Sequence, residues 1–90
     1  MKNAYLYIFN SSEFNQQEVV DYLDGVDGID SWFYSIPSSI FIIGSVSAKN
    51  LSRLLSERFG QHRHFITIIP RKSRAGWLPK DHWALFPKEE

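Results

Sequence analysis

The order in which strand-like and helix-like patterns follow one another constrains the fold of these 90 residues more than any other feature. Four runs are dense in β-branched and aromatic residues, as strands are. Two segments instead place apolar residues at helical spacing, which indicates amphipathic helices. The predicted strands are 3–9, 29–36, 40–46 and 65–69, and the predicted helices are 16–23 and a second that follows Ser47 and ends near Phe59. The resulting order is β-α-β-β-α-β.

Several local signals support these boundaries. Asn15 and Glu18 have the spacing of a capping box, and Ser47 is a predicted N-cap for the second helix. Gly25 stands where a C-terminal cap of the first helix is expected. Gly44 interrupts an apolar strand and therefore predicts a bulge or a close approach of two backbones.

This order is the split-βαβ arrangement, which predicts an α+β, ferredoxin-like sandwich with a four-stranded antiparallel sheet and two helices on one face. A chain this short builds one domain. We assign residues 1–70 to the core and residues 71–90 to a basic loop and a C-terminal segment that covers the second face of the same domain. The apolar residues of this Trp-rich covering segment are expected to be buried: Trp77, Trp83, Leu85 and Phe86.

Composition excludes some classes of site. The absence of cysteine rules out disulfides and thiolate zinc sites. The longest apolar run, Ile40 to Ile43, is too short to cross a bilayer, so we expect no membrane association and a cytoplasmic location.

Charge is distributed unevenly along the chain. The formal net charge is zero, which argues against a generic polyanion binder. Residues 1–30 nevertheless carry −5, residues 31–60 carry +2 and residues 61–90 carry +3. This asymmetry indicates either a binding face or two regions that neutralise each other in the fold.

The strongest charged cluster is formed by Arg71, Lys72 and Arg74, with Trp77 close behind and Arg63 upstream. Cations beside aromatic rings suit nucleic acid, because they contact phosphates while the rings stack on bases. The competing interpretation is a solvated loop with Trp77 packed in the core.

Two polar segments are weaker candidates. The segment Asn10, Ser11, Ser12 and Glu13 follows the first strand and precedes a helix, which suits either an anion site or a plain turn with a cap. His62 and His64 would share a face if a strand begins there, as a phosphate contact, half of a metal site or ordinary surface residues. His82 is remote from them in sequence, and we predict no metal site.

Several segments of the chain resemble the SinR-like group, which are short bacterial ferredoxin-like proteins similar to the small CRISPR-associated adaptation nucleases. The resemblance covers most of the chain, and the residues that carry it are Ala4-Tyr5-Leu6-Tyr7-Ile8, the strand around Trp32, Ser38 to Ile43, Ser47-Ala48 and Gly76-Trp77-Leu78.

The resemblance implies a homodimer and contact with nucleic acid. In the nuclease relatives an aspartate at the end of the first strand is implicated in metal-dependent phosphodiester cleavage. Asn10 occupies the matching position here, and an amide lacks the charge that Mg²⁺ prefers in a ligand.

The leading hypothesis is therefore a non-catalytic dimeric module that binds a protein partner or nucleic acid through the basic loop and tail, without a cofactor. One alternative is a metal-dependent nuclease built around Asn10, Ser11, Ser12 and Glu13, for which Mg²⁺ would be the cofactor. A second alternative is a small-ligand sensor, for which the sequence contains no dedicated motif.

Overall fold

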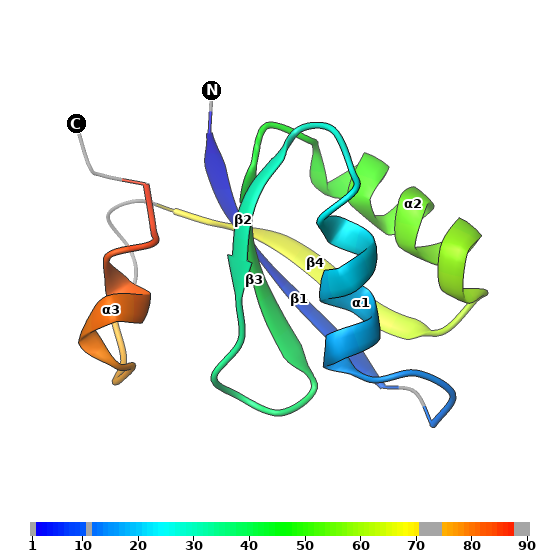
Figure 1. Cartoon of the computed structure of the whole chain (residues 1–90), viewed down its shortest axis with the longest axis horizontal. Helices are drawn as coiled ribbons and strands as arrows, with labels where there is room; N and C mark the ends of the chain where they lie inside the picture. The colour runs from blue at the N-terminus through cyan, green and yellow to red at the C-terminus, as the bar shows by residue number, and fades with distance from the viewer. Residues whose placement is uncertain (1, 11, 71–74, 88–90) are drawn as a thin grey trace.

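Strands and helices follow one another in the predicted order, and a short third helix is added near the C-terminus (Figure 1). The computed structural model describes residues 2–10, 12–70 and 75–87. Its elements are β1 (Asn3–Asn10), α1 (Gln16–Leu23), β2 (Ile29–Phe33), β3 (Ser39–Gly44), α2 (Ala48–Phe59), β4 (Arg63–Ile69) and α3 (Lys80–Trp83).

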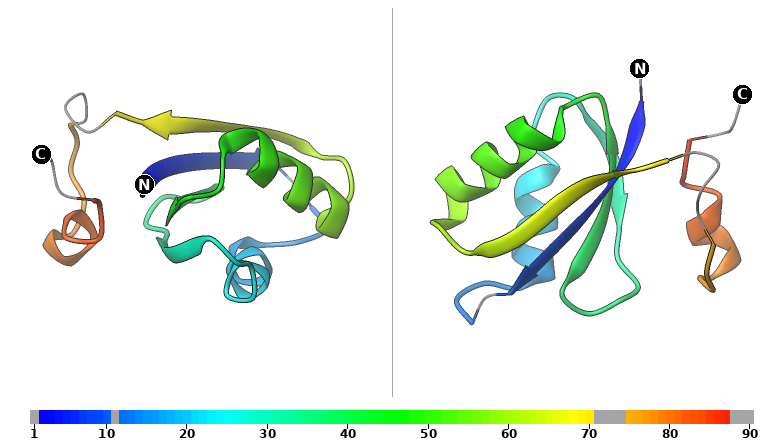
Figure 2. Two further views of the ribbon diagram at one scale, coloured as in Figure 1. Left: turned by 90° about the horizontal axis from the view of Figure 1, so that it is seen from above. Right: turned by 180° about the vertical axis from the view of Figure 1, so that it is seen from behind.

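The four strands form one antiparallel sheet in the order β2-β3-β1-β4, which makes this a small α+β domain. β1 and β3 are central, and β2 and β4 are the edge strands. Figure 2 shows α1 and α2 on one face of the sheet and α3 on the opposite side. None of the helices in the described part of the chain has the length and apolar composition that a bilayer crossing requires.

The larger core lies between the sheet and the two long helices. The helices contribute Val19, Val20 and Leu23 from α1 and Leu51 and Leu55 from α2, all of them buried. Alternate side chains of the central strands meet them, because successive residues of a strand point to opposite faces. These strand residues are Tyr5, Tyr7, Phe9, Ile40 and Ile42.

A second apolar cluster lies on the other face, where Phe86 packs edge-on against Phe33 and Phe41. Of the apolar residues expected to be buried there, Phe86 is buried, whereas Trp77 is 87% exposed and Leu85 is 41% exposed. That expectation was wrong for Trp77 and Leu85. Trp77 lies before α3 in a stretch that is neither helix nor strand. Trp83, the last residue of α3, and Phe86, three positions further on, pack toward the sheet, and Leu85 is left outside.

Both predicted N-caps are confirmed. The side-chain oxygen of Asn15 accepts a hydrogen bond from the backbone N–H of Glu18 (3.0 Å), and that of Ser47 accepts one from the N–H of Asn50 (3.2 Å). The expected glycine cap of α1 is wrong: the helix ends at Leu23, its C-cap residue Asp24 has right-handed helical geometry, and Gly25 does not adopt a positive φ.

Gly44 confirms the expected close approach of two backbones. A Cβ built there would lie 2.2 Å from the carbonyl oxygen of Gly28, so only glycine fits. The β2–β3 register also shifts between Ile29 and Ser31, so that a bulge in β2 lies beside Gly44.

The hairpin of β2 and β3 is shorter than predicted. β2 ends at Phe33, not at Ile36, and β3 ends at Gly44, not at Val46. The side-chain amide of Gln16 donates to the carbonyls of Ile36 (2.9 Å) and Ser39 (2.7 Å). These bonds hold the connecting loop against the start of α1, so the loop cannot continue the ladder.

Candidate nucleic-acid interface

The charge asymmetry of the sequence becomes a spatial one, because α1 lies beside β2 and α2 lies beside β4. The indole N–H of Trp32 in β2 donates to Asp24 at the end of α1 (2.7 Å). At the other edge, α2 packs against β4, where the hydroxyl of Ser52 meets His64 (2.7 Å). Acidic side chains therefore gather at the β2 edge: Glu18, Asp21, Asp24, Asp27 and Asp30.

The opposite edge is basic. Arg63 of β4 is exposed at this edge, and α2, which packs beside β4 on one face of the sheet (Figure 2), exposes Lys49, Arg53 and Arg58 against the acidic Glu57. The ion pair between Arg53 and Glu57 (3.2 Å) lies within α2, and that between Lys2 and Asp30 (3.6 Å) lies at the acidic edge. Neither pair joins one edge to the other.

Among the described residues, none covers the β1–β4 half of the sheet face opposite the long helices. The β1–β4 register pairs Leu6 with Thr67, Ile8 with Phe65 and Asn10 with Arg63. Leu6 packs against the second apolar cluster, and side-chain alternation therefore places Ile8, Arg63, Phe65 and Thr67 on the same face. We call Leu6, Ile8, Arg63, Phe65 and Thr67 the open strip. Ile8 is 46% exposed and Phe65 is 64% exposed.

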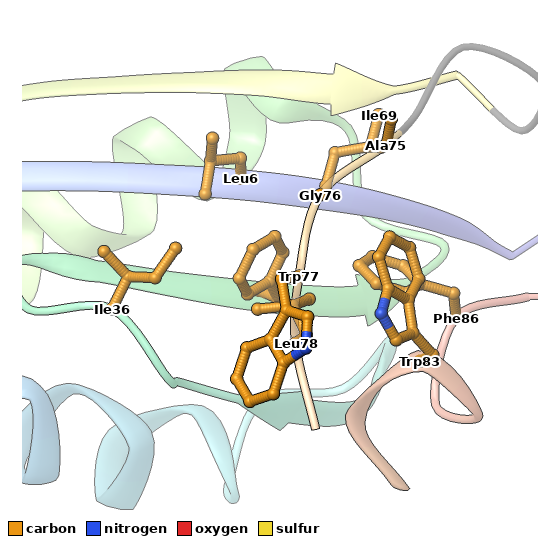
Figure 3. A pocket seen from close by; sticks show the side chains of 10 residues that line it. Leu6, Ile36, Ile69, Ala75, Gly76, Trp77, Leu78, Trp83 and Phe86 are labelled. Carbon is orange, nitrogen blue, oxygen red and sulfur yellow. The ribbon is translucent and has the colours of Figure 1, made fainter. Parts of the chain in front are cut away.

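An apolar groove of about 340 Å³ adjoins this strip, between the sheet and the C-terminal segment (Figure 3). Leu6 and Ile69 line it from the strands, and Trp77 and Trp83 line it from the C-terminal segment. Its remaining lining residues are also uncharged, so the groove suits an apolar or aromatic group better than an ion.

A polar hollow of about 340 Å³ lies at the end of β1 and contains three of the weaker candidates, Asn10, Ser12 and Glu13, together with His62. Ser11 lies outside the described residues. Glu13 supplies the carboxylate of the described lining, while Asn10 supplies an amide. A hard cation such as Mg²⁺ is held by several oxygen ligands with enough negative charge, so these residues do not fit it.

His62 and His64 are held in a hydrogen-bond network, with ring centroids 4.5 Å apart. Nδ1 of His62 lies 2.8 Å from the carbonyl oxygen of Gly60, and Nδ1 of His64 lies 2.9 Å from that of His62. A carbonyl only accepts, so Nδ1 carries the proton in both rings. Nε2 of His62 then accepts a hydrogen bond from the hydroxyl of Tyr7 (2.6 Å), and Nε2 of His64 accepts one from the hydroxyl of Ser52.

This network is structural in character. Burial raises the pKa of the Tyr7 hydroxyl above its ordinary value, which keeps the hydroxyl protonated and able to donate to His62. With both nitrogens of each ring engaged, neither histidine offers a free lone pair to a metal. The two rings do lie side by side, although β4 begins at Arg63, so that His62 precedes the strand that the prediction required.

The third histidine lies elsewhere. His82 belongs to α3, on the other side of the sheet, where it hydrogen-bonds to Ser35 and contacts the ring of Phe33. Within residues 2–10, 12–70 and 75–87, no group of three or more histidine, aspartate or glutamate side chains is placed to hold a metal ion.

Of the residues predicted to bind nucleic acid or a partner, Arg71, Lys72 and Arg74 lie outside the described residues. The structure separates the other two: Arg63 begins β4, whereas Trp77 lines the groove beside Ile69, where β4 ends. Sequence reasoning missed Phe65, which it assigned only to a strand. The alternation in β4 places Phe65 on the face of Arg63, but the sequence does not reveal that this half of the face is uncovered.

Comparisons of the chain with protein family models, with curated proteins and with solved structures find no match.

Proposed function

We propose that this chain is a small non-catalytic module of the ferredoxin-like class that binds nucleic acid along the β4 side of its sheet. The observation that carries the proposal is the separation of charge between the two sheet edges. A surface of one sign attracts a polyanion even when the net charge of the whole protein is zero.

The ferredoxin-like assignment is supported by the β2-β3-β1-β4 order with crossover helices after β1 and β3. The predicted cluster of Arg71, Lys72 and Arg74 follows β4 and Pro70 in sequence and lies outside the described residues. The relationship to SinR-like proteins and the homodimer remain predictions that accompany this proposal.

The first test measures the affinity of the purified protein for fluorescently labelled DNA and RNA by anisotropy, at 50 and 200 mM salt. Binding that depends on phosphate contacts weakens with salt, because each neutralised phosphate releases a counterion. We expect Arg63→Gln to weaken binding and to reduce the slope of log affinity against log salt by about 1.

Lys2→Gln is the matched control, since it removes the same charge at the acidic edge, where Lys2 pairs with Asp30. Equal effects of the two variants, or no binding by the unaltered protein at 50 mM salt, would contradict the proposal.

The same titration also addresses the nuclease alternative when Mg²⁺ or Mn²⁺ is added and the products are separated on denaturing gels. We expect intact nucleic acid in every lane, because the described lining of the hollow at the end of β1 contains one carboxylate, that of Glu13, and a Mg²⁺ site needs more negative charge. Metal-dependent cleavage that Glu13→Gln abolishes would instead establish catalysis at that hollow.

A further inference from the structure

Phe65 is the most unusual side chain on the open strip. It belongs to a regular edge strand, yet 64% of its surface is exposed, and its cross-strand neighbour Ile8 is 46% exposed. Exposed apolar side chains that adjoin one another on a sheet mark a surface that contacts something else. Arg63 precedes Phe65 by two residues and shares its face, so a cation and an aromatic ring stand side by side.

From this arrangement we infer that the open strip binds single-stranded nucleic acid, with an unpaired base stacked on Phe65 and a backbone phosphate held by Arg63. The inference rests on the proposed function and specifies its substrate class. Base stacking on an aromatic ring requires a base whose face is free, which a single strand provides and a duplex does not.

The dimensions of the strip support a single strand. Side chains on one face of a strand recur about every 7 Å, so Arg63, Phe65 and Thr67 cover roughly 14 Å, enough for a few nucleotides. The groove lined by Trp77 continues the surface beyond Leu6 and offers a second exposed ring.

A duplex fits this face poorly. Four strands about 4.8 Å apart, backed by two helices, are wider than the roughly 12 Å major groove that admits a helix or a two-stranded ribbon. The sheet therefore cannot enter a groove to read base edges.

Charge favours nucleic acid over a second copy of the chain as the occupant. Arg63 lies on the strip, and the acidic side chains lie at the opposite edge of the sheet. In a two-fold contact the same strip would face itself, and because the strip contains no carboxylate, Arg63 would be covered without an acidic partner from the facing strip.

The test compares labelled 12-nucleotide oligouridylate and oligothymidylate with a duplex of the same length, by fluorescence anisotropy at 50 mM salt. We expect the single strands to bind at least tenfold more tightly than the duplex. Phe65→Leu keeps the apolar character but removes the ring, and it should weaken single-strand binding by roughly 5- to 100-fold. Phe65→Tyr restores a ring and should retain affinity.

Ile68→Ala is the matched control, because Ile68 is 48% exposed on the same strand but points to the other face. It should leave binding unchanged. Since Phe65 is largely exposed, its substitution should not unfold the protein, and circular dichroism verifies this. Ile8→Ala supplies a second variant of the strip, with a smaller expected loss of about 2- to 5-fold.

The outcomes separate this inference from the proposed function. Equal binding of duplex and single strand that depends on Arg63 but not on Phe65 would overturn the inference and leave the proposed function standing. Absence of binding to all three nucleic acids would overturn both. If Phe65→Leu instead converts a dimer to a monomer, measured by light scattering, without changing affinity for the single strand, the strip is an interface between copies and the inference is wrong.

Discussion

At the scale of single residues, Gly44 and Tyr7 show how tightly the core of this small domain is specified. Gly44 lies against the backbone of Gly28, and Tyr7 is fully buried with its hydroxyl bonded to His62. Position 44 tolerates no side chain, and the buried hydroxyl of Tyr7 is satisfied by its hydrogen bond to His62.

Gly44→Ala should destabilise the fold by roughly 3 kcal/mol, because the new methyl group would overlap the carbonyl of Gly28, which belongs to the backbone and cannot move aside cheaply. Gly25→Ala is the control: its nearest neighbour would be 3.7 Å away, and we expect a change within about 0.5 kcal/mol. Urea unfolding of both variants measures the difference, and equal midpoints would refute this account of Gly44.

Because the hydroxyl of Tyr7 is buried, we predict that the free energy of unfolding falls at alkaline pH. Burial raises the pKa of its hydroxyl above the ordinary value of 10.0, so the folded state favours the protonated form. Below about pH 10 the hydroxyl is protonated in both folded and unfolded states, and its contribution to stability is complete. Above pH 10 the unfolded chain releases this proton first, and that contribution falls as the pH rises.

Tyr7→Phe isolates the effect. At pH 8 the variant should be less stable by about 1 kcal/mol, because His62 loses its hydroxyl donor. Urea unfolding between pH 8 and 11 should show this difference shrinking above pH 10. A difference that stays constant across the range would mean that Tyr7 does not titrate as described.

At the scale of elements, the C-terminal segment is attached to the sheet through few side chains. Phe86 packs edge-on against Phe33 and Phe41, with ring centroids 5.2 and 5.5 Å away, and the rest of the segment is largely exposed. Phe86 is therefore the main anchor of α3 on the second face of the sheet, with the partly buried Leu78 and Trp83 and the contact between His82 and Phe33 beside it.

Phe86→Ala should cost roughly 3 kcal/mol of unfolding free energy, since it removes a buried ring and uncovers Phe33 and Phe41. Leu85→Ala, at the exposed neighbouring position, should cost less than about 1 kcal/mol. Thermal or urea unfolding compares the two, and similar losses would show that Phe86 is not the anchor.

The sequence predicted the order of helices and strands, the N-caps of the two long helices and the backbone contact at Gly44 better than where β2 ends and which side chains are exposed. Local chemistry determines the caps at Asn15 and Ser47 and the backbone contact at Gly44, so the sequence alone identified them. The end of β2 depends on Gln16, a side chain far away in sequence, and was missed. The exposure of Phe65 and Trp77 depends on how much of the sheet α3 covers, which no local pattern encodes.

At the scale of the whole molecule, the fold converts a gradient of charge along the sequence into a difference between two sheet edges. The acidic α1 lies beside β2, and the more basic α2 lies beside β4. The sheet face that the described residues leave uncovered includes β4, so Arg63 and the aromatic ring of Phe65 occur together on it. This combination, and not the net charge, is the basis for expecting a nucleic-acid ligand.

The most direct test of this account is a titration of ¹⁵N-labelled protein with unlabelled 12-nucleotide oligouridylate, followed through backbone amide chemical shifts. The account predicts that, among the described residues, the largest changes fall on Ile8 and on residues 63–67, with α1 and β2 little affected. Changes concentrated on α1 and β2, or none at saturating oligonucleotide, would contradict it.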